Sequence, residues 1–530
     1  MSRVLITDNL APVCHDLLAQ HGVDFEVHLK KSETELADLV SEFDGWIIRS
    51  GTTITADLIE RATKLSVIGR AGVGVDNIDL DAATRKGVLV VNAPDGNTIS
   101  TAEHTCAMMQ ALARRIPHAH ASVTAGEWAR KQFSGAELMG KTLGVVGVGK
   151  IGRAVARRMQ GFEMRVLGFD PVLAEDAARR LGIELVSLDR LFAESDYITV
   201  HTPLNDATRG LLNAETLAQC KPGVRLVNCA RGGIIAEADL LDALDSGQVA
   251  GAALDVFSEE PLSDDLLRLA RHPRVVATPH IAASTGEAQE KVAVQITEQV
   301  VRALNDEPVS TPVNAGALRA AAQPEAKPFL DLADRLGQVA SQLVDGNLRR
   351  ITVRSYGEAL HRYAEVLAVA ALRGIMARWS PEPVNLINAS TLAREMGLHT
   401  SEEWRTSSGD YDYPNLVEVI VETADRTRAV IGTVRAPGDG RLVGLDGYRF
   451  EGKPEGPLLF YRNVDRPGML ATVGGILAEA GVNIAALALG RSGPGAMALT
   501  VISTDELIPT EVRRQVEAIE GVEDVHVVTL

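Results

Sequence analysis

Short apolar runs alternate with helical stretches over the first three hundred residues of the chain. Strand-like runs occur at 4–7, 45–49 and 65–69, and apolar positions three and four residues apart fill the segments between them. Such alternation is typical of a parallel sheet covered by helices. The pattern therefore predicts an α/β fold here, beginning with a small α/β unit.

A second α/β unit is predicted from about residue 100 onward. Ser100 and Glu103 have the spacing of a capping box, which predicts the start of a long helix. The apolar runs YITVHTP, VRLVNCA, VAGAALDV and RVVATPH predict four further strands. A helix predicted from Glu287 to Asn305 returns to the first unit, which would make that unit discontinuous.

The remaining chain has a different pattern. Residues 317–328 are rich in alanine and contain proline, which predicts a connector rather than a packed element. Residues from about 330 to 453 mix helical and alternating strand patterns, as in an α+β domain. The last segment has the order β-α-β-β-α-β, which is that of a ferredoxin-like fold.

A glycine-rich turn indicates what the second unit binds. The segment from Lys141 to Val146 predicts a strand, GVGKIG follows with Gly147, Gly149 and Gly152, and a helical pattern comes next. In this context the glycines allow a tight turn, a close approach to a pyrophosphate, and close packing of the helix on the strand. Asp170 ends the next strand, where a carboxylate binds a ribose 2′-hydroxyl and repels a 2′-phosphate. The prediction is a Rossmann-type domain that binds NAD rather than NADP.

Four domains are predicted, in agreement with the three or four that 530 residues suggest at roughly 100–200 residues each. They are a flavodoxin-like domain at 1–99 and 286–316, the Rossmann domain at 100–285, an intervening α+β domain at 317–453 and the ferredoxin-like domain at 454–530.

Charge and cysteine content limit the possible partners. The chain has 53 basic and 70 acidic residues and a formal net charge of −17, which disfavours binding to nucleic acid or to anionic membranes. Its four cysteines lack the spacing of a metal site or a disulfide framework, so no metal is expected. The first residues do not resemble a signal peptide, and no long apolar run suggests a membrane span. A cytoplasmic protein is expected.

Three residues at predicted strand ends or in the loops that follow carry the candidate chemistry: Arg231, Glu260 and His280. Hydride transfer from a secondary alcohol to nicotinamide releases a proton, which His280 can accept because imidazole titrates near neutral pH. Glu260 can orient the ring, and Arg231 can bind a carboxylate through two hydrogen bonds. Together they predict oxidation of a 2-hydroxy acid. Other histidines, including His104, are expected to be ordinary polar residues.

The motifs GRAGVGVDNID, GVGKIG, VNCARGG, DVFSEEP and TPHIAAST resemble those of the D-2-hydroxyacid dehydrogenases. The resemblance implies the same catalytic roles for Arg231, Glu260 and His280. It also implies that the first domain binds the substrate and that NAD contacts the glycine turn and several strand ends: Gly147, Gly149, Lys150, Ile151, Gly152, Asp170, Thr202, Cys229, Ala230, Arg231, Asp255, His280, Ile281, Ala282 and Ala283.

The carboxy-terminal half narrows the resemblance within this family. The tail is similar to an ACT domain, and the region before it is similar to the intervening domain of the long-form enzymes that oxidise D-3-phosphoglycerate to 3-phosphohydroxypyruvate, the first step of L-serine biosynthesis. A phosphorylated substrate needs additional cations. The expected substrate-binding residues are Arg49, Ser50, Arg70, Asn97 and Lys131, the last within the stretch Trp128–Lys131 that a neighbouring subunit can supply.

The ACT resemblance also implies feedback control. Asn463, Asp465 and Asn483 stand where relatives hold an amino-acid effector across a pair of ACT domains, so serine is the expected effector and a homotetramer the expected assembly. Two alternatives stay open. One is a glyoxylate or hydroxypyruvate reductase or another D-2-hydroxyacid dehydrogenase, and the other is an NAD-sensing scaffold of the corepressor type.

Overall fold

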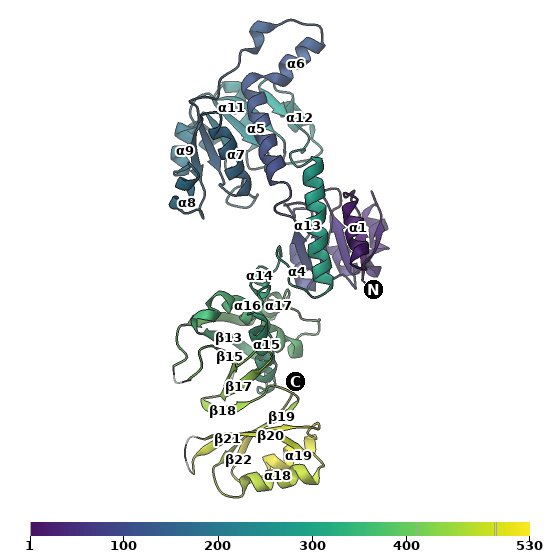
Figure 1. Cartoon of the computed structure of the whole chain (residues 1–530), viewed down its shortest axis with the longest axis vertical. Coiled ribbons are helices and arrows are strands. Elements are labelled where there is room, and N and C mark those ends of the chain that lie inside the picture. Colours follow the sequence, from purple (N-terminus) through teal and green to yellow (C-terminus); the bar gives the residue numbers. More distant parts are fainter. Residues whose placement is uncertain (1, 410, 492, 494) are drawn as a thin grey trace.

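The structure, a computed structural model, describes residues 2–409, 411–491, 493 and 495–530. Figure 1 shows an elongated chain in which the nucleotide-binding unit and the ACT unit lie at opposite ends. Four separate sheets follow one another along the sequence. Every helix among the described residues is too short or too polar to cross a lipid bilayer.

The first sheet is parallel and has the strand order β2-β1-β3-β4-β5, which is the flavodoxin-like order. Helix α13 (Gly286–Leu304) returns to this sheet, where Ile296 and Val300 pack over Gly69, as the sequence predicts. The other elements of the unit are β1 (Arg3–Ile6), α1 (Val13–Gln20), β2 (Asp24–Val27), α2 (Glu33–Ala37), β3 (Gly45–Ile48), α3 (Ala56–Arg61), β4 (Val67–Arg70), α4 (Leu80–Lys86) and β5 (Leu89–Asn92).

The second sheet is also parallel, in the order β12-β11-β10-β9-β6-β7-β8. Alternate residues of a strand face opposite sides, so Val145 packs under α5 and α7 while Val146 packs under α9, α10 and α11. The strands are β6 (Thr142–Val146), β7 (Arg165–Phe169), β8 (Glu184–Leu185), β9 (Tyr197–Val200), β10 (Val224–Asn228), β11 (Val249–Leu254) and β12 (Val275–Ala277). The helices are α5 (Thr98–Arg114), α6 (Ile116–Thr124), α7 (Lys150–Gln160), α8 (Glu175–Arg180), α9 (Leu188–Glu194), α10 (Ala214–Gln219), α11 (Glu237–Ser246) and α12 (Asp264–Ala270).

The predicted capping box at the start of α5 is wrong. The helix begins at Thr98, and its N-cap residue Asn97 makes no side-chain capping bond. Ser100 lies inside the helix, where its hydroxyl group is 2.7 Å from that of Thr285, and Glu103 pairs with Arg158 at 3.0 Å. Both side chains therefore serve tertiary contacts, which the local spacing could not reveal.

The third sheet belongs to the intervening region and has the order β14-β13-β15-β16-β17-β18. Its elements are α15 (Lys327–Gln342), β13 (Leu348–Tyr356), α16 (Ala364–Trp379), α17 (Ala389–Glu395), β14 (His399–Arg405), β15 (Leu416–Thr423), β16 (Thr427–Val434), β17 (Gly440–Leu445) and β18 (Tyr448–Gly452). The expected connector at 317–328 is partly helical, as α14 (Leu318–Ala321), and its alanines pack against the core of this region. The prediction of an unpacked connector is therefore wrong for this part of the segment. The physical reason is that alanine has a high helix propensity.

The last sheet has the order β20-β21-β19-β22, and its elements follow the predicted β-α-β-β-α-β order. Leu459 and Tyr461 face the domain's own two helices, whereas Leu458 and Phe460 share a hydrophobic core with α15 of the intervening region. The ACT and intervening units are therefore packed together as one body. The ACT elements are β19 (Pro457–Val464), α18 (Met469–Glu479), β20 (Ile484–Arg491), β21 (Met497–Thr504), α19 (Thr510–Glu517) and β22 (Val522–Thr529).

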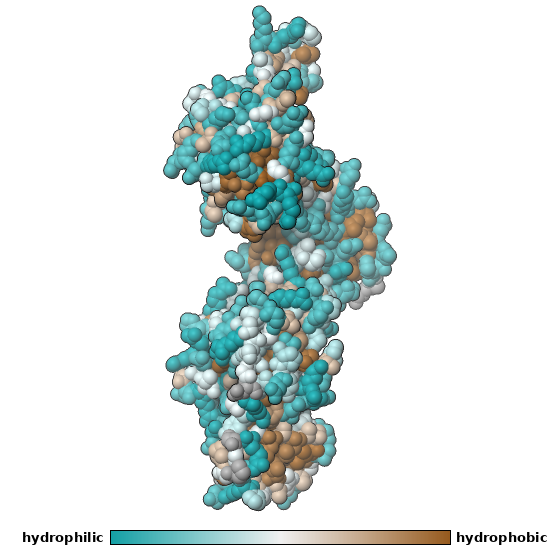
Figure 2. Space-filling model, turned by 60° about the vertical axis from the view of Figure 1, so that its left-hand side comes forward, coloured by the Kyte–Doolittle hydropathy of each residue, from teal (hydrophilic) through white to brown (hydrophobic). Residues whose placement is uncertain are grey.

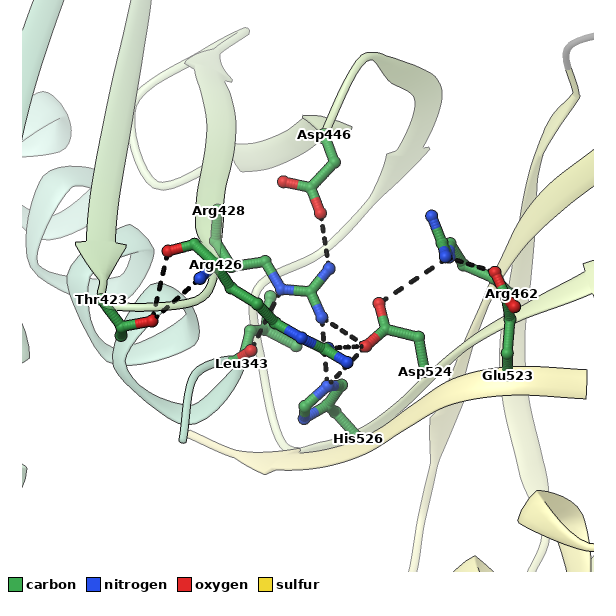
Figure 3. Close-up of polar contacts among 9 residues, drawn as sticks. All are labelled: Leu343, Thr423, Arg426, Arg428, Asp446, Arg462, Glu523, Asp524 and His526. Atoms are coloured by element: carbon green, nitrogen blue, oxygen red, sulfur yellow. Dashed lines mark hydrogen bonds and ion pairs between the residues drawn. The ribbon is translucent and has the colours of Figure 1, made fainter. Parts of the chain in front are cut away.

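A network of charged groups joins the same two units (Figure 3). The guanidinium of Arg428, on β16, is almost fully buried and lies 2.6 Å from Asp446 and 2.5 Å from Asp524 of the ACT unit. Arg426 also reaches Asp524, at 2.5 Å, and the imidazole of His526 is 3.1 Å from it. Asp524 thus accepts from several donors across the junction.

Candidate active site

A cleft of about 590 Å³ lies where the carboxyl ends of the first two sheets face each other. Ligands of open α/β sheets bind at this edge. The cleft brings together residues that are far apart in sequence, which include Arg49, Ser50, Arg70, Asn97, Arg231, Glu260, His280 and Ala283.

His280 and Glu260 form a direct pair in this cleft. Nδ1 of His280 is 2.7 Å from Oε2 of Glu260, and Oε1 of Glu260 accepts a hydrogen bond of 3.0 Å from the backbone N–H of Phe257. Partial burial acts to raise the pKa of Glu260, but these two hydrogen bonds lower it below its ordinary value. Glu260 is therefore a carboxylate at neutral pH, and Nε2 is the nitrogen that His280 has left for a ligand.

Asp255 holds the loop that carries His280. Its buried carboxylate accepts hydrogen bonds from the backbone N–H groups of Ile281 (2.9 Å) and Ala282 (2.8 Å), while its own carbonyl accepts from His280 N–H at 2.8 Å. Burial acts to raise the pKa of Asp255, but hydrogen bonds from His104, from the hydroxyl of Thr278 and from these amides lower it overall. His104 lies 3.3 Å from Asp255, so it belongs to this network rather than to an ordinary polar surface.

Arg231 follows β10 and is held from both sides of the cleft. Its Nη1 donates to the carbonyl of Ala230 at 2.7 Å, and its Nε donates to Asp76 of the first unit at 3.0 Å. The buried side chain of Asn228 shapes the turn, because it donates to the Arg231 carbonyl and accepts from Ala230 N–H. Gly232 has no side chain, and a Cβ there would overlap the backbone of Phe257, so only glycine lets the Arg231 and Glu260 loops approach so closely.

Arg49 and Arg70 place two further cations in the cleft. Burial, together with the nearby positive charges of Arg231 and Arg49, lowers the pKa of Arg70 to about 10. Among the described residues, Nε of Arg70 and Oδ1 of Asn97 are buried and have no hydrogen-bond partner. Buried polar groups are almost always paired, and both residues line the cleft, so these atoms are available to a bound ligand. Three guanidinium groups in one cleft suit a substrate with more than one anionic group.

The glycine turn has the geometry that nucleotide binding needs. Gly147 has a φ of +87°, which favours glycine, and a Cβ on Gly152 would overlap the carbonyl of Gly147. No atom lies within 4 Å of the position that a Cβ on Gly149 would take, so the backbone there faces open space at the start of α7. Oδ2 of Asp170 accepts from Val148 N–H at 2.9 Å, which places that carboxylate beside the turn.

The other predicted cofactor residues lie along the same sheet edge. The hydroxyl of Thr202 is buried and, within the described part of the chain, has no hydrogen-bond partner. Burial raises the pKa of the Cys229 thiol to about 12, so this cysteine is a neutral packing residue. Lys150, the first residue of α7, is exposed and pairs with Asp95, and Ile151 follows it in the helix. An open glycine turn, an acidic group at the end of β7 and an unpaired hydroxyl together fit a dinucleotide.

Lys131 is not brought to this cleft. It lies in a short 3₁₀ segment, η2 (Arg130–Phe133), next to α6, which projects away from the cleft at the far end of the nucleotide-binding unit in Figure 1. Its predicted contact with substrate would therefore require a neighbouring subunit, as the sequence analysis allowed.

The three predicted effector residues do not converge within one chain. Asp465 lies beside the end of β21 that begins at Met497, where its carboxylate is 2.7 Å from Nε of Arg491. Asn483 lies near the opposite end of β21, where its amide donates to Asp505 at 2.6 Å. An eight-residue strand spans about 26 Å, so one small amino acid cannot touch both. Asn463 is buried and accepts from Thr500 at 2.9 Å.

Asp76, Asn228 and His104 belong to the site although the sequence analysis did not select them. Asp76 and Asn228 do lie within the motifs GRAGVGVDNID and VNCARGG, so the motifs pointed to their neighbourhood. Asn228 contacts Arg231 from three residues away, whereas Asp76 contacts it from 155 residues away. His104 had no local signal, because it lies on α5 while its partner Asp255 follows β11, far along the chain.

Comparison with known proteins is consistent with this geometry. Residues 106–282 match the family of the D-isomer specific 2-hydroxyacid dehydrogenase, NAD binding domain, residues 325–446 match the D-3-phosphoglycerate dehydrogenase intervening domain, and residues 458–521 match the ACT domain. The fold class predicted from the sequence is confirmed by these matches.

Individual relatives agree. The D-3-phosphoglycerate dehydrogenase of Bacillus subtilis is 40% identical over 531 residues, which cover all of both chains, and that of Homo sapiens is 43% identical over 493 residues, or 91% of each chain. A crystal structure of D-lactate dehydrogenase from Aquifex aeolicus with NAD and lactic acid is 28% identical, with a TM-score of 0.53 over 57% of this chain and 96% of that one. The chain therefore belongs to the D-3-phosphoglycerate dehydrogenases, the long-form branch of the D-2-hydroxyacid dehydrogenase family that carries an intervening and an ACT domain.

Proposed function

We propose that this protein oxidises D-3-phosphoglycerate to 3-phosphohydroxypyruvate with NAD, as the first step of L-serine biosynthesis. The observation that carries the proposal is the single cleft in which Arg231, Glu260 and His280 meet two further arginines, Arg49 and Arg70. The match to D-3-phosphoglycerate dehydrogenases over the whole length supports the choice of substrate.

The residues of the cleft have separate roles in the oxidation of the alcohol. When bound, NAD supplies the acceptor for the hydride of the alcohol carbon. Nε2 of His280 accepts the hydroxyl proton, and the charge of Glu260, hydrogen-bonded at Nδ1, stabilises the imidazolium that results. Arg231 binds the substrate carboxylate and keeps the alcohol carbon in place. In the reverse direction the same imidazolium returns the proton to the carbonyl oxygen.

Arg49 and Arg70 bind the phosphate of the substrate. Both line the cleft from the first unit, at the carboxyl ends of β3 and β4. Ser50 and Asn97 add neutral hydrogen-bonding groups there, and Lys131 of a neighbouring subunit completes the cluster. Phosphate carries about two negative charges near neutral pH, so a cluster of cations gives selectivity over unphosphorylated acids.

Two surfaces support a homotetramer. Ile116, Val123 and Trp128 are exposed on and beside α6 of the nucleotide-binding unit. Leu470, Ile484 and Leu487 are exposed on the ACT unit, whose apolar surface is visible at the lower end of Figure 2. Pairing of two ACT units brings Asp465 of one chain toward Asn483 of the other, which gives serine a site that one chain lacks. The cytoplasm stays the expected location of the enzyme.

The direct test is a steady-state assay of NADH formation from D-3-phosphoglycerate, with hydrazine to trap the keto product. We expect turnover by the native protein and loss of turnover in His280→Ala, while His21→Ala, at an exposed position that follows α1, leaves it intact. A screen of glyoxylate, hydroxypyruvate and other unphosphorylated acids distinguishes the reductase alternative. Activity on none of these compounds, with NADH still bound, would instead favour the scaffold alternative.

A further inference from the structure

The contact between Asp76 and Arg231 joins the two α/β units directly. Oδ2 of Asp76 accepts from Nε of Arg231 at 3.0 Å, and both residues line the cleft. Asp76 follows β4 and Arg231 follows β10, so the ion pair crosses from the first sheet to the second. The position of Asp76 therefore affects how Arg231 is presented to a ligand.

The contact orients the guanidinium without covering all of it. Asp76 accepts a hydrogen bond from Nε, and the Ala230 carbonyl accepts one from Nη1. Nη2 and the second N–H of Nη1 are left as donors for a ligand. Only glycine at position 74 leaves room for Nη2, because a Cβ on Gly74 would overlap both Nη2 and the Asp76 carboxylate. The free pair of donors has the geometry to bind a carboxylate through two parallel hydrogen bonds.

Asp76 is also connected to helix α4, which begins four residues later. Asn77 is anchored by its amide to the carbonyls of Arg49 (2.7 Å) and Thr52 (2.5 Å), and Asp79 caps the helix by accepting from Ala82 N–H at 2.9 Å. The seven residues of α4 form a rod of about 10 Å. The helix therefore forms a short, capped connection between its far end and the segment that holds Asp76.

The intervening region docks on that far end. Asn385 donates its amide to the carbonyl of Gly87, the C-cap residue of α4, at 2.8 Å, and a Cβ on Gly87 would be only 2.5 Å from that amide nitrogen. Arg85 of α4 pairs with Glu395 at 3.1 Å and with Glu382 at 3.4 Å. Figure 1 shows α4 next to α17 of the intervening region.

We propose that Asp76 is a positioning residue for Arg231 and that the intervening domain sets the position of Asp76 through its contact with α4. Because the ACT and intervening units share one hydrophobic core, a movement of the ACT unit reaches α4 through the same contact. The inference rests on the proposed function, since its readout is turnover of D-3-phosphoglycerate.

The first part is tested with Asp76→Ala and Asp76→Asn in the full-length protein. We expect Asp76→Ala to raise KM for D-3-phosphoglycerate about tenfold, the loss typical of one hydrogen bond between charged groups, with a smaller fall in kcat. Asp76→Asn keeps an acceptor for Nε and should recover part of the loss. The Kd for NADH, measured by fluorescence, should not change. An unchanged or lower KM in Asp76→Ala overturns the proposal, because Asp76 would then be neutral or would obstruct the site.

The second part is tested with Asn385→Asp, which keeps the oxygen that accepts from Ile387 and Asn388 N–H but replaces the amide that donates to Gly87. The matched control is Asn213→Asp, which loses an equivalent 2.9 Å bond to the Gly210 carbonyl at the start of α10, away from the cleft.

We expect Asn385→Asp to lower kcat/KM about threefold in the native background and to have no further effect in Asp76→Ala, because double-mutant cycles report coupling of this kind. The control should do neither. Additive effects of the two changes, or an equal loss in Asn213→Asp, overturn the role of α4. A native protein that does not turn over D-3-phosphoglycerate refutes the proposed function instead.

Discussion

Nδ1 of His280 lies 2.7 Å from Oε2 of Glu260, and the other oxygen of that carboxylate accepts a hydrogen bond from Phe257 N–H. The carboxylate is therefore oriented from the loop after β11, while the imidazole comes from the loop after β12. This arrangement places a fixed negative charge on the side of the imidazole that faces away from a bound alcohol.

Glu260→Gln should lower kcat for D-3-phosphoglycerate by about 10²-fold, within the range of general acid–base effects, because the amide cannot balance the charge of the imidazolium. The measurement is the steady-state rate of NADH formation at saturating substrate. Glu259→Gln is the matched control, because Glu259 precedes it, is exposed and does not line the cleft. Equal losses in both variants would contradict the assignment.

Arg49→Ala should raise KM for D-3-phosphoglycerate by about tenfold or more, because one of the phosphate-binding cations is lost. The KM for an unphosphorylated 2-hydroxy acid such as D-glycerate should stay the same. Little structure depends on this side chain, whose one hydrogen bond among the described contacts is 3.3 Å long, to the Asn9 carbonyl.

Arg61→Ala, which breaks an exposed pair with Asp57 in the same unit, serves as the control for Arg49. If Arg49→Ala affects both substrates to the same extent, its role is general and the phosphate assignment is wrong.

Asp170→Ser should reduce the preference for NAD over NADP by about tenfold, because the carboxylate that repels a 2′-phosphate is removed. The ratio of kcat/KM for the two cofactors measures this preference. Asp176→Ser is the control, because Asp176 is an exposed acidic residue on α8, which also follows β7. It tests whether the loss of any nearby acidic group changes the cofactor preference. An unchanged ratio in Asp170→Ser would mean that another group selects the cofactor.

Arg428→Met should destabilise the chain by about 1.5–3 kcal/mol, because it removes one of the two arginines that pair with the nearly buried Asp524 at the junction of the intervening and ACT units, while Arg426 and His526 remain. Chemical denaturation followed by circular dichroism measures the loss. Arg179→Met removes an exposed pair with Asp176 and should change little. A similar stability of both variants would show that the shared apolar core alone holds the two units together.

The same junction should be sensitive to acid. Burial acts to raise the pKa of Asp524, but hydrogen bonds from His526, Arg428 and Arg426 hold it well below its ordinary value. A depressed pKa stabilises the fold fully above the ordinary pKa of about 3.9, and this contribution is lost as the pH falls below it. Free energies of unfolding between about pH 5 and pH 2 should therefore fall less steeply in Asp524→Asn than in the native protein. Parallel curves would rule out this contribution.

Local spacing was sufficient for the nucleotide turn and for the order of the ACT elements. Gly147 is needed for its positive φ and Gly152 because a Cβ there would meet the Gly147 carbonyl, both of them requirements within the turn, and the strands of a ferredoxin-like unit follow from alternation within each segment. Such features depend on short-range sterics and on which face of one element is apolar. The alanine-rich segment at 317–328 shows the opposite case, because its packing partners lie on α16 and η3 (Glu358–Tyr363), far along the chain, and local composition could not reveal them.

Contacts between segments that are distant along the chain could not be predicted from local spacing. Residue types and motifs indicated that Arg231, Glu260 and His280 carry the chemistry, because oxidation of a 2-hydroxy acid needs an acceptor for the alcohol proton and a cation for the carboxylate in any fold. The fold alone showed that Asp76 holds Arg231 from the other sheet, that His104 supports Asp255, and that Asp465 and Asn483 lie at opposite ends of one strand. The physical reason is that hydrogen bonds and ion pairs act over about 3 Å in space, whereas the sequence orders residues only along the chain.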